Sequence, residues 1–153
     1  MDAPASRCIE MTRPWYETKG DLARERLFAK KIIGQRETVH LFKLPIKFIV
    51  DYAIVQDGAV IAWMEMRHRT TRKAKYYDYQ TSAAKLSAGV ILGEMYTLPF
   101  YLFVRFKDTD SWMEIDRNYL DGRRLEMMYL TSRNDPQDIE PCVSIPLTDL
   151  KDF

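Results

Sequence analysis

The sequence has few of the residues and patterns on which several common classes of protein depend. Its 153 residues include two cysteines, Cys8 and Cys142, and two histidines, His40 and His68, without the spacing of a zinc site, so we expect no dedicated zinc centre. We expect both cysteines to be reduced and structural, because no secretory signal accompanies them. Neither a glycine-rich phosphate loop nor a serine–histidine or cysteine–histidine pattern is present, which argues against P-loop nucleotide binding and triad-type catalysis.

Long apolar runs and an excess of one charge are also missing. No apolar run reaches the roughly 18 residues needed to span a membrane, and the N-terminal residues lack the apolar core of a signal peptide. We therefore expect a cytoplasmic protein without a membrane partner. The 23 Lys and Arg residues nearly balance the 22 Asp and Glu residues, so the net charge of +1 gives no indication of a nucleic-acid partner.

The remaining composition indicates a folded domain. Hydrophobic residues make up 46% and aromatic residues 12% of the chain, enough for a sizeable core. Residues 1–17 contain two prolines and few periodic apolar positions, and we expect an N-terminal arm there, followed by a single domain at 18–153. The apolar pattern then predicts, in chain order, a helix at 18–33, a strand at 37–44, a hairpin at 48–69, a helix at 81–96 and a strand at 99–106.

Strands dominate the predicted last third of the chain. We expect a rather exposed strand at 111–117 that pairs with a strand at 124–130, then a short extended piece at 142–145 and a helical turn from Thr148. A hairpin among these elements predicts a mixed sheet with helices packed on its faces, which is an α/β (α+β) fold.

The hairpin carries the strongest local signal. Asp57-Gly58 between two apolar runs is typical of a two-residue β-turn. Each run also contains an acid where burial would be costly, Asp51 in the first and Glu65 in the second. Because side chains alternate along a strand, we expect Glu65 and Arg67 on one face and the neighbouring methionines on the other.

A third acid, Glu25, falls inside the apolar stripe of the helix at 18–33. It lies either at the wet margin of that stripe or in a functional site. Two carboxylates on adjacent strands with a third from a packed helix are what a hard divalent cation such as Mg²⁺ needs. Arg67, on the same face as Glu65, could then hold a water or stabilise charge on a phosphate.

A basic, tyrosine-rich segment follows the hairpin. Cations bind phosphates and aromatic rings offer stacking surfaces for bases, so this segment is either a solvated loop or a nucleic-acid-binding one. Lys85, on a largely apolar face of the next helix, is either a snorkelling side chain or part of the same surface. The segment contains Arg67, Arg69, Arg72, Lys73 and Lys75, followed by Tyr76, Tyr77 and Tyr79.

These residues resemble the PD-(D/E)XK nuclease superfamily, which has a restriction-endonuclease-like core of a helix, three antiparallel strands, a helix and a strand. That order matches residues 18–106 and leaves 107–153 as a strand-rich C-terminal extension. The superfamily motif, an Asp followed by an acid-x-Lys, corresponds to Asp51 and the triplet Glu65-Met66-Arg67. The additional helical glutamate of many members corresponds to Glu25.

The resemblance also implies a polar or basic residue near the site from the second helix region, for which Gln80 and Lys85 are candidates. Two positions depart from the motif: Val50 stands in place of its proline, and Arg67 in place of its lysine. Arginine keeps the charge but is larger, planar and always protonated, so it cannot take over a lysine's role unaltered. Arg67 either contacts substrate or water, or forms a salt bridge with a site carboxylate that locks the site.

The leading hypothesis from this resemblance is a nuclease that hydrolyses DNA phosphodiester bonds with Mg²⁺ or Mn²⁺. Asp51, Glu65 and Glu25 would hold the metal, and Arg67 would contact the scissile phosphate or the attacking water. The DNA would be held by basic side chains, namely Arg69, Arg72, Lys73, Lys75 and Lys85. The alternative is a catalytically degenerate nuclease fold acting as a nucleic-acid-binding or structural subunit, for example in a phage particle. Its termini would then contact partner proteins, and its location would be the virion.

Overall fold

A computed structural model of the chain describes residues 19–20, 23–24, 27, 34, 38–45, 47–130 and 135–152. The predicted arm at 1–17, Glu25 and most of the predicted first helix lie outside these residues. The described positions within 18–33 are all helical. No helix in the described part of the chain is long and apolar enough to cross a membrane.

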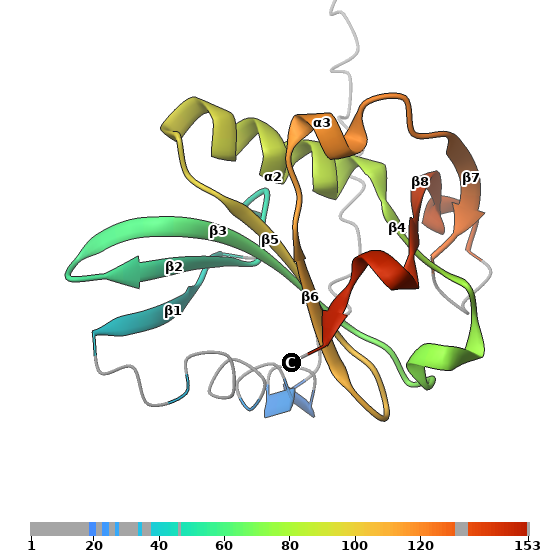
Figure 1. The fold of residues 1–153 in the computed structure, drawn as a ribbon, viewed down its shortest axis with the longest axis horizontal. Coiled ribbons are helices and arrows are strands. Elements are labelled where there is room, and N and C mark those ends of the chain that lie inside the picture. Colours follow the sequence, from blue (N-terminus) through green and yellow to red (C-terminus); the bar gives the residue numbers. More distant parts are fainter. Residues whose placement is uncertain are drawn as a thin grey trace, which may run out of the picture.

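The larger sheet contains the predicted hairpin, and its neighbouring strands pair antiparallel except for β3 (Ala59–His68) and β5 (Phe100–Arg105), which run parallel (Figure 1). The sheet is therefore mixed, as predicted. Within the described residues its strand order is β1 (Val39–Lys43), β2 (Tyr52–Gln56), β3 (Ala59–His68), β5 (Phe100–Arg105), β6 (Asp110–Glu114) and β9 (Lys151–Asp152).

The turn between β2 and β3 has the geometry that its sequence predicts. Asp57 has φ 51° and Gly58 has φ 79°, and two consecutive left-handed residues match the right-handed twist of the flanking strands. The register aligns Tyr52 with Met64, after an irregularity between Ile54 and Val55. This register places the residue before β2, Asp51, beside the second half of β3.

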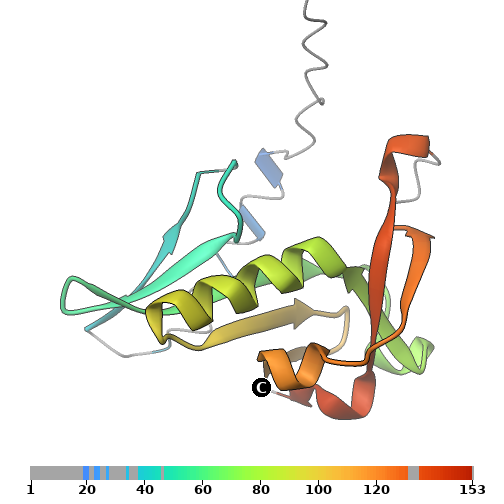
Figure 2. The same ribbon diagram turned by 90° about the horizontal axis from the view of Figure 1, so that it is seen from above.

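Helix α2 (Ala83–Tyr96) covers one face of the larger sheet (Figure 2). Its buried residues Leu86 and Val90 share one apolar cluster with Leu102 and Val104 of β5. The opposite face carries a second cluster that includes Met64 and Met66 of β3 with Phe103. The alternation predicted for β3 is confirmed, because the methionines lie on the face away from α2.

Local sequence fixes both ends of α2 and its close approach to the sheet. The Ser82 hydroxyl caps the first turn by accepting from the Lys85 amide at 3.4 Å, and Thr97 ends the helix in a left-handed conformation with φ 54°. Gly89 lies directly against the Phe100 ring, where a Cβ would overlap the ring atoms. The helix was predicted from residue 81, but Thr81 and Ser82 belong to a strand.

A second, smaller sheet lies beside the N-terminal end of α2 (Figure 2). Its strand order among the described residues is β4 (Asp78–Ser82), β8 (Ile139–Pro146) and β7 (Leu125–Tyr129). The predicted pairing of 124–130 with 111–117 is wrong, since β7 pairs with β8. The short piece expected at 142–145 is an eight-residue central strand. Strand β4 was missed because its sequence, DYQTS, carries little apolar periodicity.

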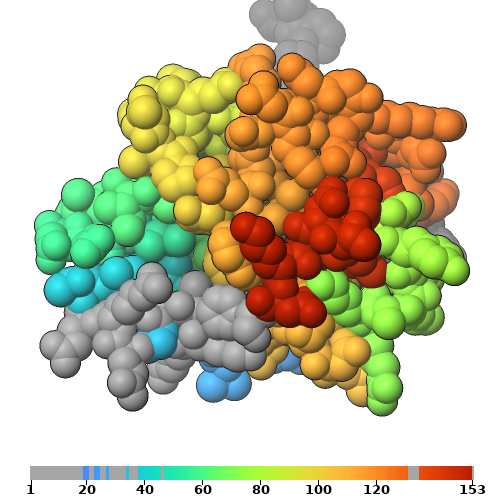
Figure 3. All heavy atoms as spheres, in the orientation of Figure 1, coloured from blue at the N-terminus to red at the C-terminus, as the bar shows by residue number. Residues whose placement is uncertain are grey.

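Strand β6 is more buried than predicted. Ser111 is fully buried and Asp110 and Met113 nearly so, because β6 lies between β5 and β9. A short helix, α3 (Arg117–Leu120), follows it, and 3₁₀ turns occupy Lys73–Lys75, Pro136–Asp138 and Leu147–Asp149. The C-terminal residues, red in Figure 3, lie on the surface next to residues around 70–80, in green, where Lys73 Nζ donates to the Leu150 carbonyl at 3.0 Å.

Candidate active site

Glu65 lies in the middle of β3 on the face that α2 covers, and its side chain is completely buried. Across the parallel pair it is in register with Leu102, a fully buried member of the apolar cluster beneath α2. A carboxylate in such a place loses its hydration and requires charged or polar partners. The surrounding elements supply three charged side chains, from Asp51, Arg67 and Lys85.

Asp51, directly before β2, is held against β3 by its own carboxylate. Its Oδ2 accepts a hydrogen bond from the Met66 backbone amide at 3.2 Å. The second oxygen, Oδ1, lies 3.8 Å from the Lys85 ammonium. The structure therefore brings the first two motif acids, Asp51 and Glu65, together as predicted from the hairpin register.

Lys85 reaches both carboxylates from the first turn of α2. Its Nζ lies 3.8 Å from Glu65 Oε1 and 3.8 Å from Asp51 Oδ1, so these two oxygens are separated by no more than twice that distance. The ammonium also donates to the Ile49 carbonyl at 3.2 Å, and a third of the side chain remains exposed. Lys85 thus lies at the acids themselves. This is the place for which the resemblance offered Gln80 and Lys85 as candidates, in addition to the DNA-holding role expected of Lys85.

Arg67 forms an ion pair with Glu65 Oε1. Burial lowers the pKa of Arg67, but the negative charge of Glu65, with smaller effects of Tyr79 and Asp51, more than offsets this and leaves the pKa raised. The guanidinium is therefore a permanent positive charge beside Glu65, with its side chain 35% exposed. Of the two roles left open for Arg67, the salt bridge is the one observed in this structure.

Burial raises the pKa of Glu65 from 4.5 to about 7, with Arg67 opposing the shift and Asp51 adding to it. Oε2 of Glu65 has no hydrogen-bond donor among the described residues. A buried carboxylate oxygen without a donor is costly. The site therefore leaves one strong acceptor open to a ligand that can replace the lost hydration.

Glu140 of β8 is a further acid near the site that the sequence did not single out. It accepts a hydrogen bond from the Ser82 hydroxyl at 2.7 Å, and Ser82 caps the helix that carries Lys85. Its negative charge also acts on Arg67. No local pattern marks it, because only the pairing of β8 with β4 brings residue 140 to the start of α2.

The basic segment divides into different environments. Arg69 donates to the Gln80 carbonyl at 2.7 Å and its guanidinium stacks 4.9 Å above the Tyr79 ring. Lys73 is bound by the Asp152 carboxylate and the Leu150 carbonyl. The others, Arg72 and Lys75, are exposed, and Lys75 lies over the Tyr76 ring.

The chemistry of the donors fits a hard divalent cation. Asp51 and Glu65 offer carboxylate oxygens, and the donor-free Oε2 of Glu65 is an oxygen that such an ion could use. Within the described residues no group of three His, Cys, Asp or Glu side chains forms a ready metal cluster, and Glu25 lies outside them. Two carboxylates with waters and substrate oxygens are a usual set for Mg²⁺.

Comparisons with known proteins give one family. A family model described as phage putative PDDEXK endonuclease matches residues 11–153. Among solved structures, the chain is similar to Hjc, a Holliday junction resolvase of Archaeoglobus fulgidus, with 13% identity over 80% of this chain and 86% of that chain and a TM-score of 0.45. A search of curated protein sequences gave no match.

Proposed function

The chain belongs to the phage putative PDDEXK endonuclease family, and we propose that it hydrolyses DNA phosphodiester bonds with the help of a divalent cation, Mg²⁺ or Mn²⁺. The observation that carries this proposal is the convergence of Asp51, Glu65 and Lys85, in which one ammonium lies 3.8 Å from an oxygen of each acid. Two acids and one lysine are the chemical components of the family motif. Here the lysine comes from α2 rather than from β3.

Lys85 takes the part that the motif gives to a lysine on the strand. An ammonium has three donors, of which one is bound by the Ile49 carbonyl. The ammonium lies 3.8 Å from an oxygen of each acid, and from this position its remaining donors can orient an attacking water or stabilise charge that develops on a phosphate oxygen. Arg67 cannot deprotonate and instead holds Glu65 in place.

Asp51 and Glu65 would hold the cation, with Glu25 as a further candidate from the first helix. When bound, the ion would polarise the scissile phosphate and lower the pKa of a coordinated water. The Met66 amide fixes the orientation of Asp51, and the apolar cluster beneath α2 keeps bulk water from Glu65. Arg69, Arg72 and Lys75 would contribute favourable charge toward the DNA backbone.

The proposal is tested by incubating the protein with double- and single-stranded DNA in Mg²⁺, Mn²⁺ or EDTA, beside the variant Asp51→Asn. Asparagine keeps an oxygen for the Met66 amide but removes the charge, so the fold should persist while cleavage falls. We expect a loss larger than the roughly 10- to 100-fold that changes outside the direct ligands cost. The matched control is Asp57→Asn, the same change in the hairpin turn, where Asn-Gly is well tolerated.

Cleavage that persists in EDTA or in Asp51→Asn would refute the proposal. Calorimetry gives a second readout that does not depend on turnover. Because the pKa of Glu65 is raised to about 7, a cation competes with a proton for this carboxylate at pH 6 and much less at pH 8, so Mn²⁺ affinity should be higher at pH 8 than at pH 6.

One observation favours a second candidate function, a nuclease fold that binds nucleic acid or assembles with proteins but does not cleave. The ion pair between Arg67 and Glu65 is the contact that a locked, metal-free site would contain. This candidate predicts no calorimetric signal for Mn²⁺ at either pH. It also predicts that the variant Arg67→Ala, like wild type, does not cleave DNA in the presence of Mg²⁺ or Mn²⁺.

A further inference from the structure

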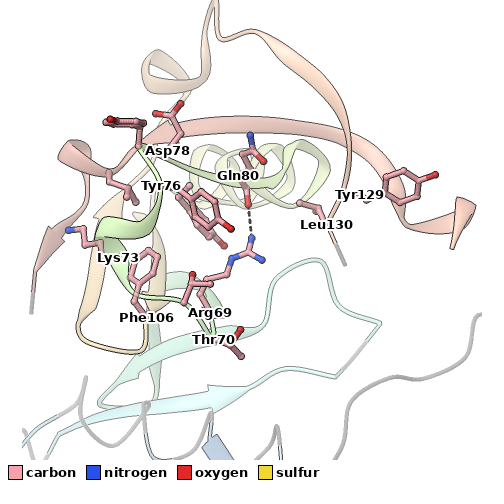
Figure 4. Close-up of a pocket in the computed structure, with 13 residues that line it drawn as sticks. Arg69, Thr70, Lys73, Tyr76, Asp78, Gln80, Phe106, Tyr129 and Leu130 are labelled. Carbon is pink, nitrogen blue, oxygen red and sulfur yellow. Dashed lines mark hydrogen bonds between the residues drawn. The ribbon is translucent and has the colours of Figure 1, made fainter. Parts of the chain in front are cut away.

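A pocket of about 490 Å³ opens between the segment that follows β3 and the edge of the smaller sheet (Figure 4). This volume lies within the range of small-molecule sites, roughly 300 to 1,000 Å³. Its lining includes Arg69 and Thr70 from the segment after β3, Tyr76 and Tyr77 before β4, and Tyr129 and Leu130 from the end of β7. Of the residues that line it, the proposed function uses only Arg69, as one of several charges that attract the DNA backbone.

The pocket adjoins the candidate active site, because Arg69, which lines it, comes two residues after Arg67. The Arg69 amide donates to the Arg105 carbonyl at 2.7 Å and so continues the parallel ladder of β3 and β5. With a period of two, Arg69 follows Glu65 and Arg67 on the same face. Tyr79, which lines the pocket, is close enough for its hydroxyl to act electrostatically on Arg67.

The inner wall of the pocket offers hydrogen-bonding groups held in fixed positions. Arg69 is held by the Gln80 carbonyl and the Tyr79 ring, as Figure 4 shows for the first contact. Among the described residues this is the one hydrogen bond of its guanidinium, which leaves further N–H donors for a ligand. Tyr79 is only 3% exposed, and its buried hydroxyl has no hydrogen-bond partner in the described part of the chain.

The rim of the pocket consists of unusually exposed aromatic rings. Tyr77 is 95% exposed, Tyr76 58% and Tyr129 51%. Aromatic rings are large apolar surfaces, and several of them around one pocket are typical of a binding site rather than of an inert surface. Rings beside guanidinium N–H donors match the two parts of a nucleotide, the face of a base and a phosphate or base edge.

We propose that this pocket receives an unpaired nucleotide, so that the protein selects single-stranded DNA, or a single-stranded end or flap, at the candidate active site. This inference rests on the proposed function and adds the form of the substrate. In a duplex the faces of the bases are covered by their neighbours, whereas an unpaired base can stack on tyrosine. Arg69 would bind the phosphate or the base edge, and Tyr77 and Tyr129 would contact the base.

Lys73 contributes less to this pocket than its charge suggests. Although it lines the pocket, its ammonium is bound by Asp152 and by the Leu150 carbonyl. The attraction for nucleic acid at this place therefore depends on stacking and on Arg69 more than on the total charge of the segment. We expect binding through the pocket to weaken less with salt than binding to a basic surface does.

The test measures binding in EDTA by fluorescence anisotropy, with a 15-nucleotide single strand and the matching duplex, for wild type, Tyr77→Ala and Tyr96→Ala. Tyr77 is almost fully exposed, so its replacement should not affect folding. Tyr96 is a matched control, 60% exposed at the far end of α2 and about 16 Å from Lys85 along the helix axis. We expect Tyr77→Ala to weaken single-strand binding about 5- to 100-fold, with duplex binding and Tyr96→Ala changed less than twofold.

Equal losses on single strand and duplex, no loss at all, or the same loss in Tyr96→Ala would overturn the inference. Photocrosslinking of a single strand that contains 5-iodouracil gives an independent readout. The expected adducts are on the tryptic peptides 76–85, which carries Tyr77, and 125–133, which carries Tyr129, and adducts confined to other peptides would contradict the inference. Because neither measurement requires cleavage, selective single-strand binding without hydrolysis would refute the proposed function and leave this inference standing.

Discussion

Glu65, Arg67 and Arg69 form a row on one face along β3 and its continuation. The two ends of this row differ in their burial and in the groups that surround them. Glu65 is completely buried among charged partners from three separate elements. Two residues beyond Arg67, Arg69 lies in a pocket whose rim is formed by exposed tyrosines. Low dielectric strengthens charge interactions at the first place, while stacking dominates at the second. The two proposals together therefore predict that cleavage and strand selection can be changed separately, although the residues proposed for both follow the same strand.

The largest effect is expected from removing the charge of Lys85, which should lower the cleavage rate at the buried region and leave binding at the pocket nearly unchanged. Replacing Lys85 with methionine keeps the aliphatic stem but removes the ammonium that lies between the carboxylates. We expect the cleavage rate to fall about 100- to 1,000-fold, as for loss of one preorganised donor, with single-strand affinity in EDTA changed less than threefold. Rates are compared with those of Lys107→Met, the same change at an exposed lysine outside both regions. A fall in affinity as large as the fall in rate would remove the distinction between the regions.

The pH dependence of stability tests the buried region alone. The folded-state pKa of Glu65 is raised from 4.5 to about 7, so the folded protein binds this proton more tightly than the unfolded chain. The stability due to the protonated form is fully present below about pH 4.5 and is lost as the pH rises to about 7. At about 1.4 kcal/mol per pKa unit the loss is about 3 kcal/mol.

Urea unfolding in EDTA between pH 4.5 and 8 measures this effect, with Glu65→Gln as the comparison. The free energy of unfolding of wild type should decrease relative to that of the variant over this range. A constant difference between the two proteins would mean that Glu65 has an ordinary pKa. Tyr77→Ala, in the exposed region, should follow wild type at every pH.

A packing substitution tests how far the geometry of the buried region depends on α2. In Gly89→Ala the new methyl group would overlap the Phe100 ring, which is itself only 2% exposed. We expect a loss of about 1 to 2 kcal/mol of unfolding free energy, because overpacking exceeds the gain in helix propensity. Lys85 is one turn away, so cleavage should also fall in protein that remains folded.

Ser87→Ala, on the exposed side of the same helix, is the control for Gly89→Ala. It should leave stability within about 0.5 kcal/mol of wild type. If Gly89→Ala were neutral in both stability and rate, the close packing of α2 on β5 would not position the site. Thermal unfolding and single-turnover cleavage are the measurements.

The smallest effect is expected at the C-terminal contact of the pocket. Lys73→Ala removes the ion pair with Asp152, whose side chain is 61% exposed. Lys73 itself is only 17% exposed and also donates to the Leu150 carbonyl, so we expect a loss of about 1 kcal/mol of unfolding free energy and a change in single-strand affinity of less than threefold. A large loss of affinity, measured by anisotropy, would mean that total charge rather than stacking governs the pocket.

Several parts of this protein could be predicted from neighbouring residues in the sequence. The Asp57-Gly58 turn, the alternation along β3 and the helix at α2 are encoded by short-range patterns, which is why the pairing of Asp51 and Glu65 was foreseen. The smaller sheet was not foreseen, and one of its strands was paired wrongly. The pairing of β4 with β8 joins residues 60 to 68 positions apart, and no local window contains that information. The pairing of β7 with β8 joins residues only 10 to 18 apart, but 124–130 was predicted to pair with the strand before it in the chain.

The sequence by itself determined which residues could supply the chemistry, because residue type and a period of two or 3.6 decide which side chains share a face. Only the tertiary structure decided their roles. Packing of α2 on the sheet brought Lys85 within 3.8 Å of both acids, and pairing of β8 with β4 brought Glu140 to the cap of that helix. Such contacts depend on how whole elements bury their apolar faces against one another, so the position of a charge at the site follows from the packing of residues far from it in the chain.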